Sequence, residues 1–142
     1  MRILFLGDVV GRAGRDAVIR EMPTLKDSLK PDVVIINGEN AAHGLGITDK
    51  ICAEFYEAGA HCITTGNHVW DKKDIMSYIG SDPRLLRPEN FPDGTPGKGH
   101  YTHTLDDGRK ILIINVMGRL FMDPMDDPFA AVKKHLKAEG LK

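Results

Sequence analysis

Residues 33–40 read VVIINGEN, and this stretch decides the fold class. Its first four residues form a continuous β-branched run, which is typical of a strand buried on both faces of a parallel sheet. Glycine, glutamate and asparagine follow at once, so the predicted strand ends in a turn that carries oxygen-bearing side chains. Two other stretches have the same form, residues 3–8 (ILFLGD) and residues 62–68 (CITTGNH). The sequence therefore predicts three buried strands with polar ends.

Helical patterns separate these strands. Apolar residues at spacings of four, three and four predict the inner face of a first helix: Val18, Met22, Leu25 and Leu29. Pro23 lies within this pattern, so we expect a kink or a break there. Thr48 is expected to cap a second helix that ends at Ala58, and Asp71 is expected to open a third.

The pattern changes after residue 80. Residues 80–99 are rich in proline and glycine and are expected to form a loop, with a short strand near Leu85 and Leu86. The strand-like runs 101–105 and 110–116 flank an Asp-Gly pair, which favours a β-hairpin. Asp127 precedes a proline, an arrangement typical of the start of a helix.

The order of these elements predicts an α/β fold with a mostly parallel sheet flanked by helices, in a single domain of residues 1–142. Crossovers between parallel strands are almost always right-handed. In sheets of this kind the ligand binds beyond the carboxyl ends of the strands. We therefore expect the functional residues in the loops that follow the three buried strands.

The composition excludes several classes of protein. The chain has 142 residues, of which 42% are hydrophobic, so it is not of a disordered type. Its 19 basic and 20 acidic residues give a net charge of −1, which points to neither extended nucleic acid nor an anionic membrane as a partner. No apolar run approaches the roughly 18 residues of a membrane span. Two cysteines without a paired spacing predict reduced thiols and a cytoplasmic location.

Polar side chains follow all three predicted strands and can converge, because parallel strands lie about 4.8 Å apart. Two carboxylates in one cleft repel each other, and a divalent metal removes this repulsion. Oxygen ligands with an imidazole nearby suit Mn, Fe or Zn. Glu39, on the middle of the three, could bridge two ions roughly 3.5–4 Å apart. Asp8 and Asn40 would then serve one ion, and Asn67 the other.

His68 is expected to face the substrate rather than the metal, because adjacent residues on an extended stretch point apart. Its ordinary pKa near 6.5 suits a general acid. His43 could contact substrate, and Arg12 stands at a helix start that favours anions. Taken singly, such residues are more often turn, cap or solvated residues, so the site rests on their joint placement. The other histidines are interpreted as structural or solvated: His61, His100, His103 and His135.

Five segments together are similar to the YmdB-like branch of the calcineurin-type metallophosphoesterases. They are residues 7–12 (GDVVGR), 37–44 (NGENAAHG), 66–71 (GNHVWD), 115–119 (NVMGR) and 126–129 (DDPF). The resemblance implies a phosphodiesterase that hydrolyses 2′,3′-cyclic nucleotides with two divalent transition metal ions, iron or manganese. It further implies half of a metallophosphoesterase α/β sandwich, because this chain resembles only the N-terminal half of such proteins.

By the same resemblance, four residues would be metal ligands: Asp8, Glu39, Asn40 and Asn67, with Glu39 bridging. His68 would protonate the departing ribose oxygen after in-line attack by a metal-activated hydroxide. The family's further histidine ligands have no counterpart here, so this chain would carry about half of the site. An exposed sheet edge is expected where further strands would pair, and it favours a homo-oligomer.

Two other functions remain open from the sequence. One is a non-catalytic binding or assembly module on an incomplete metallophosphoesterase fold. The other is a metal-independent nucleotide binder that uses the glycine-rich loop of residues 7–14. That loop matches neither the dinucleotide-binding nor the P-loop spacing, and the strand-end carboxylates favour the metal site.

Overall fold

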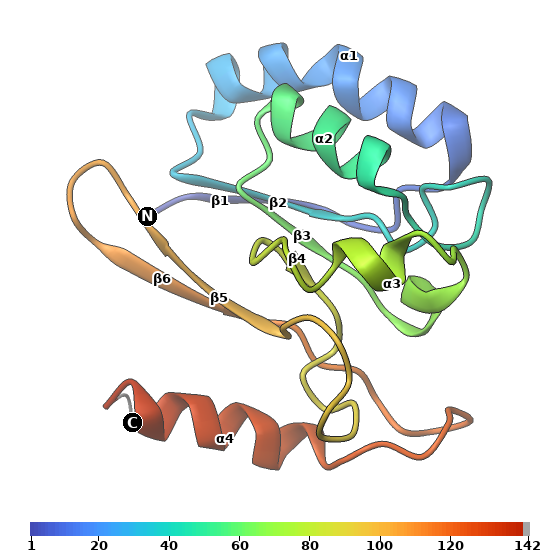
Figure 1. The fold of residues 1–142 in the computed structure, drawn as a ribbon. Coiled ribbons are helices and arrows are strands. Elements are labelled where there is room, and N and C mark those ends of the chain that lie inside the picture. The colour runs from blue at the N-terminus through green and yellow to red at the C-terminus, as the bar shows by residue number, and fades with distance from the viewer. Residues whose placement is uncertain (141–142) are drawn as a thin grey trace.

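The computed structural model describes residues 1–140 of the chain. A four-stranded parallel sheet forms its centre, in the order β1 (Ile3–Leu6), β2 (Val33–Asn37), β3 (Cys62–Thr64) and β4 (Leu85–Leu86) (Figure 1). The helical elements are α1 (Gly11–Leu29), α2 (Asp49–Ala58), the 3₁₀ turn η1 (Asn67–Trp70), α3 (Ile75–Tyr78) and α4 (Pro128–Ala138). A separate antiparallel hairpin consists of β5 (His100–Thr104) and β6 (Lys110–Ile114). The predicted α/β class is confirmed.

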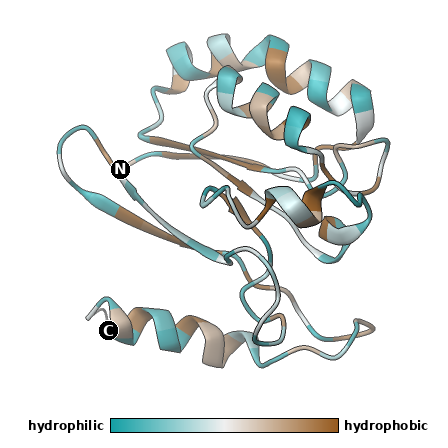
Figure 2. Cartoon of the chain, viewed as in Figure 1, coloured by the Kyte–Doolittle hydropathy of each residue, from teal (hydrophilic) through white to brown (hydrophobic). Residues whose placement is uncertain are grey.

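The elements stack in layers. Helices α1 and α2 lie on one side of the parallel sheet, the hairpin lies on the other side, and α4 lies beyond the hairpin (Figure 1). Hydrophobic residues run along the parallel strands and part of the hairpin (Figure 2). The sequence predicted that helices cover the faces of the sheet. In the structure the two strands of the hairpin cover the second face, and α4 lies beyond them (Figure 1).

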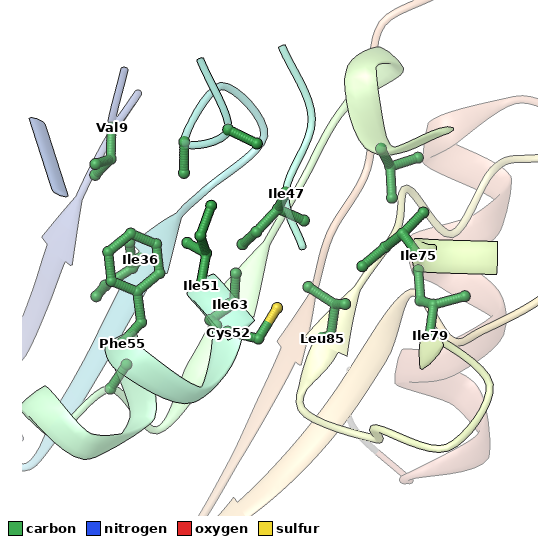
Figure 3. Packing of buried hydrophobic residues seen from close by; sticks show 14 of the residues in the cluster. Val9, Ile36, Ile47, Ile51, Cys52, Phe55, Ile63, Ile75, Ile79 and Leu85 are labelled. Carbon is green, nitrogen blue, oxygen red and sulfur yellow. The ribbon is translucent and has the colours of Figure 1, made fainter. Parts of the chain in front are cut away.

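Strand β2 is buried on both faces, as its continuous apolar run predicts. On one face Ile36 packs with Phe55 of α2 in the larger core cluster (Figure 3). On the other face Val33 and Ile35 pack with Ile113 of the hairpin. The sheet is thus fixed from both sides around its second strand, with the strand ends free to present polar groups.

Strand β1 differs from the prediction. It stands at the edge of the sheet, and Ile3 and Phe5 are 50% and 55% exposed. In the parallel register Ile3 pairs with Val33, so both side chains point to the same face, but the hairpin covers only the latter. A continuous apolar run therefore does not guarantee burial. Strand β1 thus forms an edge of the sheet with exposed apolar side chains.

Helix α1 runs through Pro23 without a break. The preceding residue, Met22, is fully buried, whereas Pro23 itself is exposed. The carbonyl that proline leaves without a donor lies one turn back, at Ile19, a residue that is 38% exposed. The predicted break is therefore wrong.

The predicted caps of α2 and α4 are confirmed. The Thr48 hydroxyl accepts the amide of Ile51, and the Asp127 carboxylate accepts the amide of Phe129 at 2.8 Å. The third helix is shorter than expected and begins four residues after Asp71. Within residues 1–140, no helix combines the length and the apolar character that crossing a membrane requires.

His61 makes the stability of this fold depend on pH. Its Nδ1 accepts the amide of Val34 at 2.9 Å, so the folded chain needs the neutral ring. Burial lowers the pKa of His61, and the nearby positive charges of His103, Lys26 and Arg84 lower it further.

As the pH falls through the ordinary imidazole value of about 6.5, unfolded chains take up a proton that folded His61 does not. We therefore expect the free energy of unfolding to fall until the pH passes below the lowered value. Urea unfolding at a series of pH values should show a weaker pH dependence for His61→Gln than for the wild type. Equal dependence in both would contradict this role.

Candidate metal site at the strand ends

The loops that follow β1 and β2 are bonded to each other. Asp8 adopts a left-handed conformation (φ 50°), which an aspartate tolerates better than most residues. Its Oδ1 accepts Nδ2 of Asn40 at 2.7 Å. The amide of Gly11 also donates to the carbonyl of Asn40, at 2.8 Å. The structure thus brings together Asp8 and Asn40, which the sequence placed on one ion.

Glu39 lies against the end of β3. A Cβ added to Gly66 would lie 2.1 Å from Oε2 of Glu39 and 2.9 Å from its Oε1. Only glycine leaves room for the carboxylate there, immediately before Asn67 in the chain. The end of the middle strand therefore contacts the end of its neighbour, as the convergence argument requires.

Unpartnered buried oxygens gather in these loops. Among the described residues, four buried side-chain polar atoms have no hydrogen-bond partner, and three of them are acceptors on residues 37–40: Asn37 Oδ1, Glu39 Oε2 and Asn40 Oδ1. Burying such oxygens without a donor costs free energy, and a cation that accepts their lone pairs removes the cost. The donor set therefore fits a hard or borderline divalent ion. Sequence reasoning did not single out Asn37, which ends β2 itself.

His68 lies in the 3₁₀ turn η1 and not on an extended stretch. The prediction that His68 and Asn67 point apart assumed an extended backbone, so its reason is wrong. Both residues nevertheless line one cavity of about 360 Å³. His68 Nδ1 is 2.7 Å from Oδ2 of Asp71, which sequence reasoning had assigned to a helix start. The spacing of three residues was the signal that could have revealed this pair.

The two suggested substrate contacts lie elsewhere. His43 lines a different cavity, of about 370 Å³, together with Arg15 and Lys72. Arg12 is directed to solvent, where its guanidinium pairs with Asp16 at 3.5 Å. The structure does not group either residue with His68.

Three backbone amides of the glycine-rich loop are already bonded within the chain. The amide of Val9 donates to the carbonyl of Asn37, that of Gly11 to Asn40, and that of Gly14 to Val10. A phosphate cradle needs such amides free. This bonding speaks against the metal-independent nucleotide binder.

Two histidines that the sequence left as structural or solvated meet at a glutamate. His135 Nε2 lies 2.7 Å from Glu89 Oε1, and His100 Nδ1 lies 3.4 Å from its Oε2. The rings of the two histidines are 3.9 Å apart between centroids. No sequence spacing connects these residues, which come from three separate segments.

The two cysteines behave as inert core residues. Cys52 and Cys62 are buried and free. Burial is the main reason that the pKa of Cys62 rises to about 12 and that of Cys52 rises well above its ordinary value. Trp70 likewise packs, edge to face, against Phe91 at 5.9 Å. None of these residues supports a redox or base-stacking role.

The chain belongs to the YmdB-like protein family, whose model matches residues 4–141. It is 55% identical over 141 residues to a 2′,3′-cyclic-nucleotide 2′-phosphodiesterase of Bacillus subtilis, covering 99% of this chain and 51% of that protein. The chain spans about half the length of the curated relatives that it matches.

Two solved structures share its fold. A hypothetical protein from Thermus thermophilus superposes with a TM-score of 0.89 at 42% identity, over 96% of this chain and 53% of that one. A structure described as a novel phosphatase from Mycoplasma pneumoniae gives a TM-score of 0.88 at 32% identity, over 97% and 51%. The fold and the family are therefore established together.

Gly66→Ala tests the contact with Glu39. The new methyl group would force the buried carboxylate aside, so we expect a loss of about 1–3 kcal/mol in the free energy of unfolding, as for other overpacked sites. Gly80→Ala is the matched control, because a Cβ at Gly80 meets open space. Thermal unfolding compares the two variants. If the Gly66→Ala chain is as stable as the control, the Glu39 carboxylate can move aside without a cost in stability.

Proposed function

We propose that this chain provides part of a binuclear, metal-dependent phosphodiesterase that hydrolyses 2′,3′-cyclic nucleotides. The observation that carries the proposal is the group of buried oxygens without donors at the carboxyl end of β2. The name of the Bacillus subtilis relative supports the substrate class. We assign four residues as ligands: Asp8, Glu39, Asn40 and Asn67.

The arrangement of the side chains gives each a distinct task. Asn40 donates its amide nitrogen to Asp8, which leaves its amide oxygen available as a ligand. Glu39 follows β2, which lies between β1, the strand before Asp8, and β3, the strand before Gly66. Its carboxylate lies against Gly66. It is therefore the residue suited to bridge two ions. Bound divalent ions would neutralise charge on the phosphoryl oxygens and lower the pKa of a water molecule.

His68 is the proposed proton donor. Its hydrogen bond to Asp71 occupies Nδ1 and fixes the ring, so that Nε2 is the nitrogen left for substrate. His68 and Asn67 line the same cavity, which supports a proton donor close to a proposed ligand. In this assignment His68 gives a proton to the ribose oxygen as the P–O bond breaks. Asp71 acts through His68 and is a positioning residue.

Other parts of the sequence prediction stay predictions: iron or manganese as the native metal, a cytoplasmic location, a homo-oligomer, and no extended nucleic acid as partner. The homo-oligomer draws support from the exposed apolar side chains of β1, Ile3 and Phe5. The non-catalytic module remains the alternative function. It differs from the phosphodiesterase in one measurable respect, because the complete gene product would then hydrolyse no cyclic nucleotide even when loaded with metal.

Glu39→Ala tests the metal site. Removing the bridging carboxylate should remove both ions and with them the hydrolysis of 2′,3′-cyclic AMP by the complete gene product. Metal analysis and a hydrolysis assay with added Mn²⁺ measure the two effects. Glu57→Ala is the control, because Glu57 is an exposed glutamate on α2. Full metal content together with full hydrolysis in Glu39→Ala would end the proposal.

His68→Ala separates binding from proton transfer. The metal content should remain, whereas turnover should fall by about 10²–10⁴, the usual contribution of a general acid. Asp71→Asn should lower turnover less than His68→Ala does, because the imidazole that donates the proton remains. It should also shift the pH profile of turnover, because the ring loses its negatively charged partner. Unchanged turnover in His68→Ala would remove this residue from its assigned role.

A further inference from the structure

A cluster of three potential metal ligands lies apart from the residues of the proposed phosphodiesterase site. Glu89 comes from the loop between β4 and β5, His100 begins β5, and His135 lies on α4. One ligand atom from each residue can be chosen so that all three lie within 4.8 Å of one another. All three residues are half-buried. The fold thus gathers two imidazoles and a carboxylate from segments far apart in the chain.

We propose that Glu89, His100 and His135 bind one Zn²⁺ ion. Two histidines and one glutamate form a ligand set that proteins use for zinc, with a water molecule in the fourth position. Zinc bonds of about 2.0–2.2 Å place neighbouring ligand atoms of a tetrahedral site roughly 3.3–3.6 Å apart. The distance from His100 Nδ1 to Glu89 Oε2 is already 3.4 Å. His135 Nε2 lies 2.7 Å from the other carboxylate oxygen, Oε1, so this pair must move apart to admit the ion.

The glutamate is held in place by its own loop. Its Oε2 accepts the amide of Gly99 at 2.9 Å. A Cβ on Gly99 would lie 2.3 Å from Cα of Glu89, so the close approach of the two backbones requires glycine. Hydrogen bonds that orient a ligand carboxylate are a regular part of zinc sites. Although burial raises the pKa of Glu89, the hydrogen bonds to His135 and His100 outweigh it and lower the pKa overall.

The ion would hold α4 against the rest of the fold. No residue of this helix is fully buried, and Phe129 is 76% exposed, so apolar packing holds the helix weakly. His135 lies near the end of the helix opposite to the Asp127 cap. A metal bond at His135 would join this end to the hairpin and to the loop before it. Ligand binding to the folded chain alone raises its stability.

The test uses the 142-residue chain carrying Glu39→Ala, so that the strand-end site does not contribute. After removal of metal with a chelator, the protein is titrated with Zn²⁺ alone by calorimetry and its thermal unfolding is followed. We expect one ion per chain and a higher unfolding temperature with zinc. Adding His135→Gln should weaken binding by more than the roughly 10–100-fold typical of losing a second-layer partner.

His103→Gln is the matched control. His103 lies on the same strand as His100, but its ring faces His61 at 4.7 Å between centroids. Zinc binding that falls equally in the His103 and His135 variants, or that is absent from the parent chain, overturns the proposal.

A third measurement does not depend on the folding of the His135 variant. Zinc-soaked crystals of the Glu39→Ala chain should show an anomalous peak among Glu89, His100 and His135. Anomalous peaks found only at other residues would overturn the assignment. Every chain in this experiment lacks Glu39, so a failure to bind zinc would say nothing against the proposed phosphodiesterase site. A failure of the phosphodiesterase site would likewise say nothing against zinc binding by Glu89, His100 and His135.

Discussion

The parallel register of β1, β2 and β3 is the constraint on which the candidate site depends. Leu6 lies opposite Ile36, and Asn37 lies opposite Thr64, so the three strands end at nearly the same level. Whatever follows each strand must then share one edge of the sheet. The chain uses this edge for Asp8, for Glu39 and for a glycine whose missing side chain admits the glutamate. A shift of the strand register would move these groups apart, and no shared site could then form.

The resulting edge has an excess of hydrogen-bond acceptors over donors. Folding normally pairs a buried oxygen with an amide or a hydroxyl, and three oxygens at residues 37–40 have no such partner. A protein could relieve this by protonating a carboxylate, but an amide oxygen has no such route at ordinary pH. The amide oxygens of Asn37 and Asn40 therefore argue for a cation more strongly than a carboxylate would by itself. The Nδ2 donor of Asn40 is already bonded to Asp8 and leaves that deficit intact.

The sequence predicted what depends on local chemistry. The buried strand β2, the caps at Thr48 and Asp127, and the polar residues at three strand ends were all readable, because each follows from neighbours in the chain. The exposure of β1 was not readable, since its apolar run resembles that of β2 and only the strand order makes it an edge. The contact between His135 and Glu89 spans 46 residues and follows no period. Such contacts depend on how layers stack, which no local pattern encodes.

Two asparagines, Asn90 and Asn115, hold the segment between β6 and α4 to the rest of the molecule. Asn115, which follows β6, donates to the carbonyls of Thr65 and Leu86 at 2.8 and 3.1 Å, which ties the hairpin to the ends of β3 and β4. Asn90, only 1% exposed, accepts the amide of Met117 and donates to its carbonyl and to that of Asp126. Directional bonds of this kind specify one path for the segment leading to α4 even where apolar burial is slight. The two asparagines therefore fix where α4 begins, whereas the position of its far end rests on His135 and Glu89.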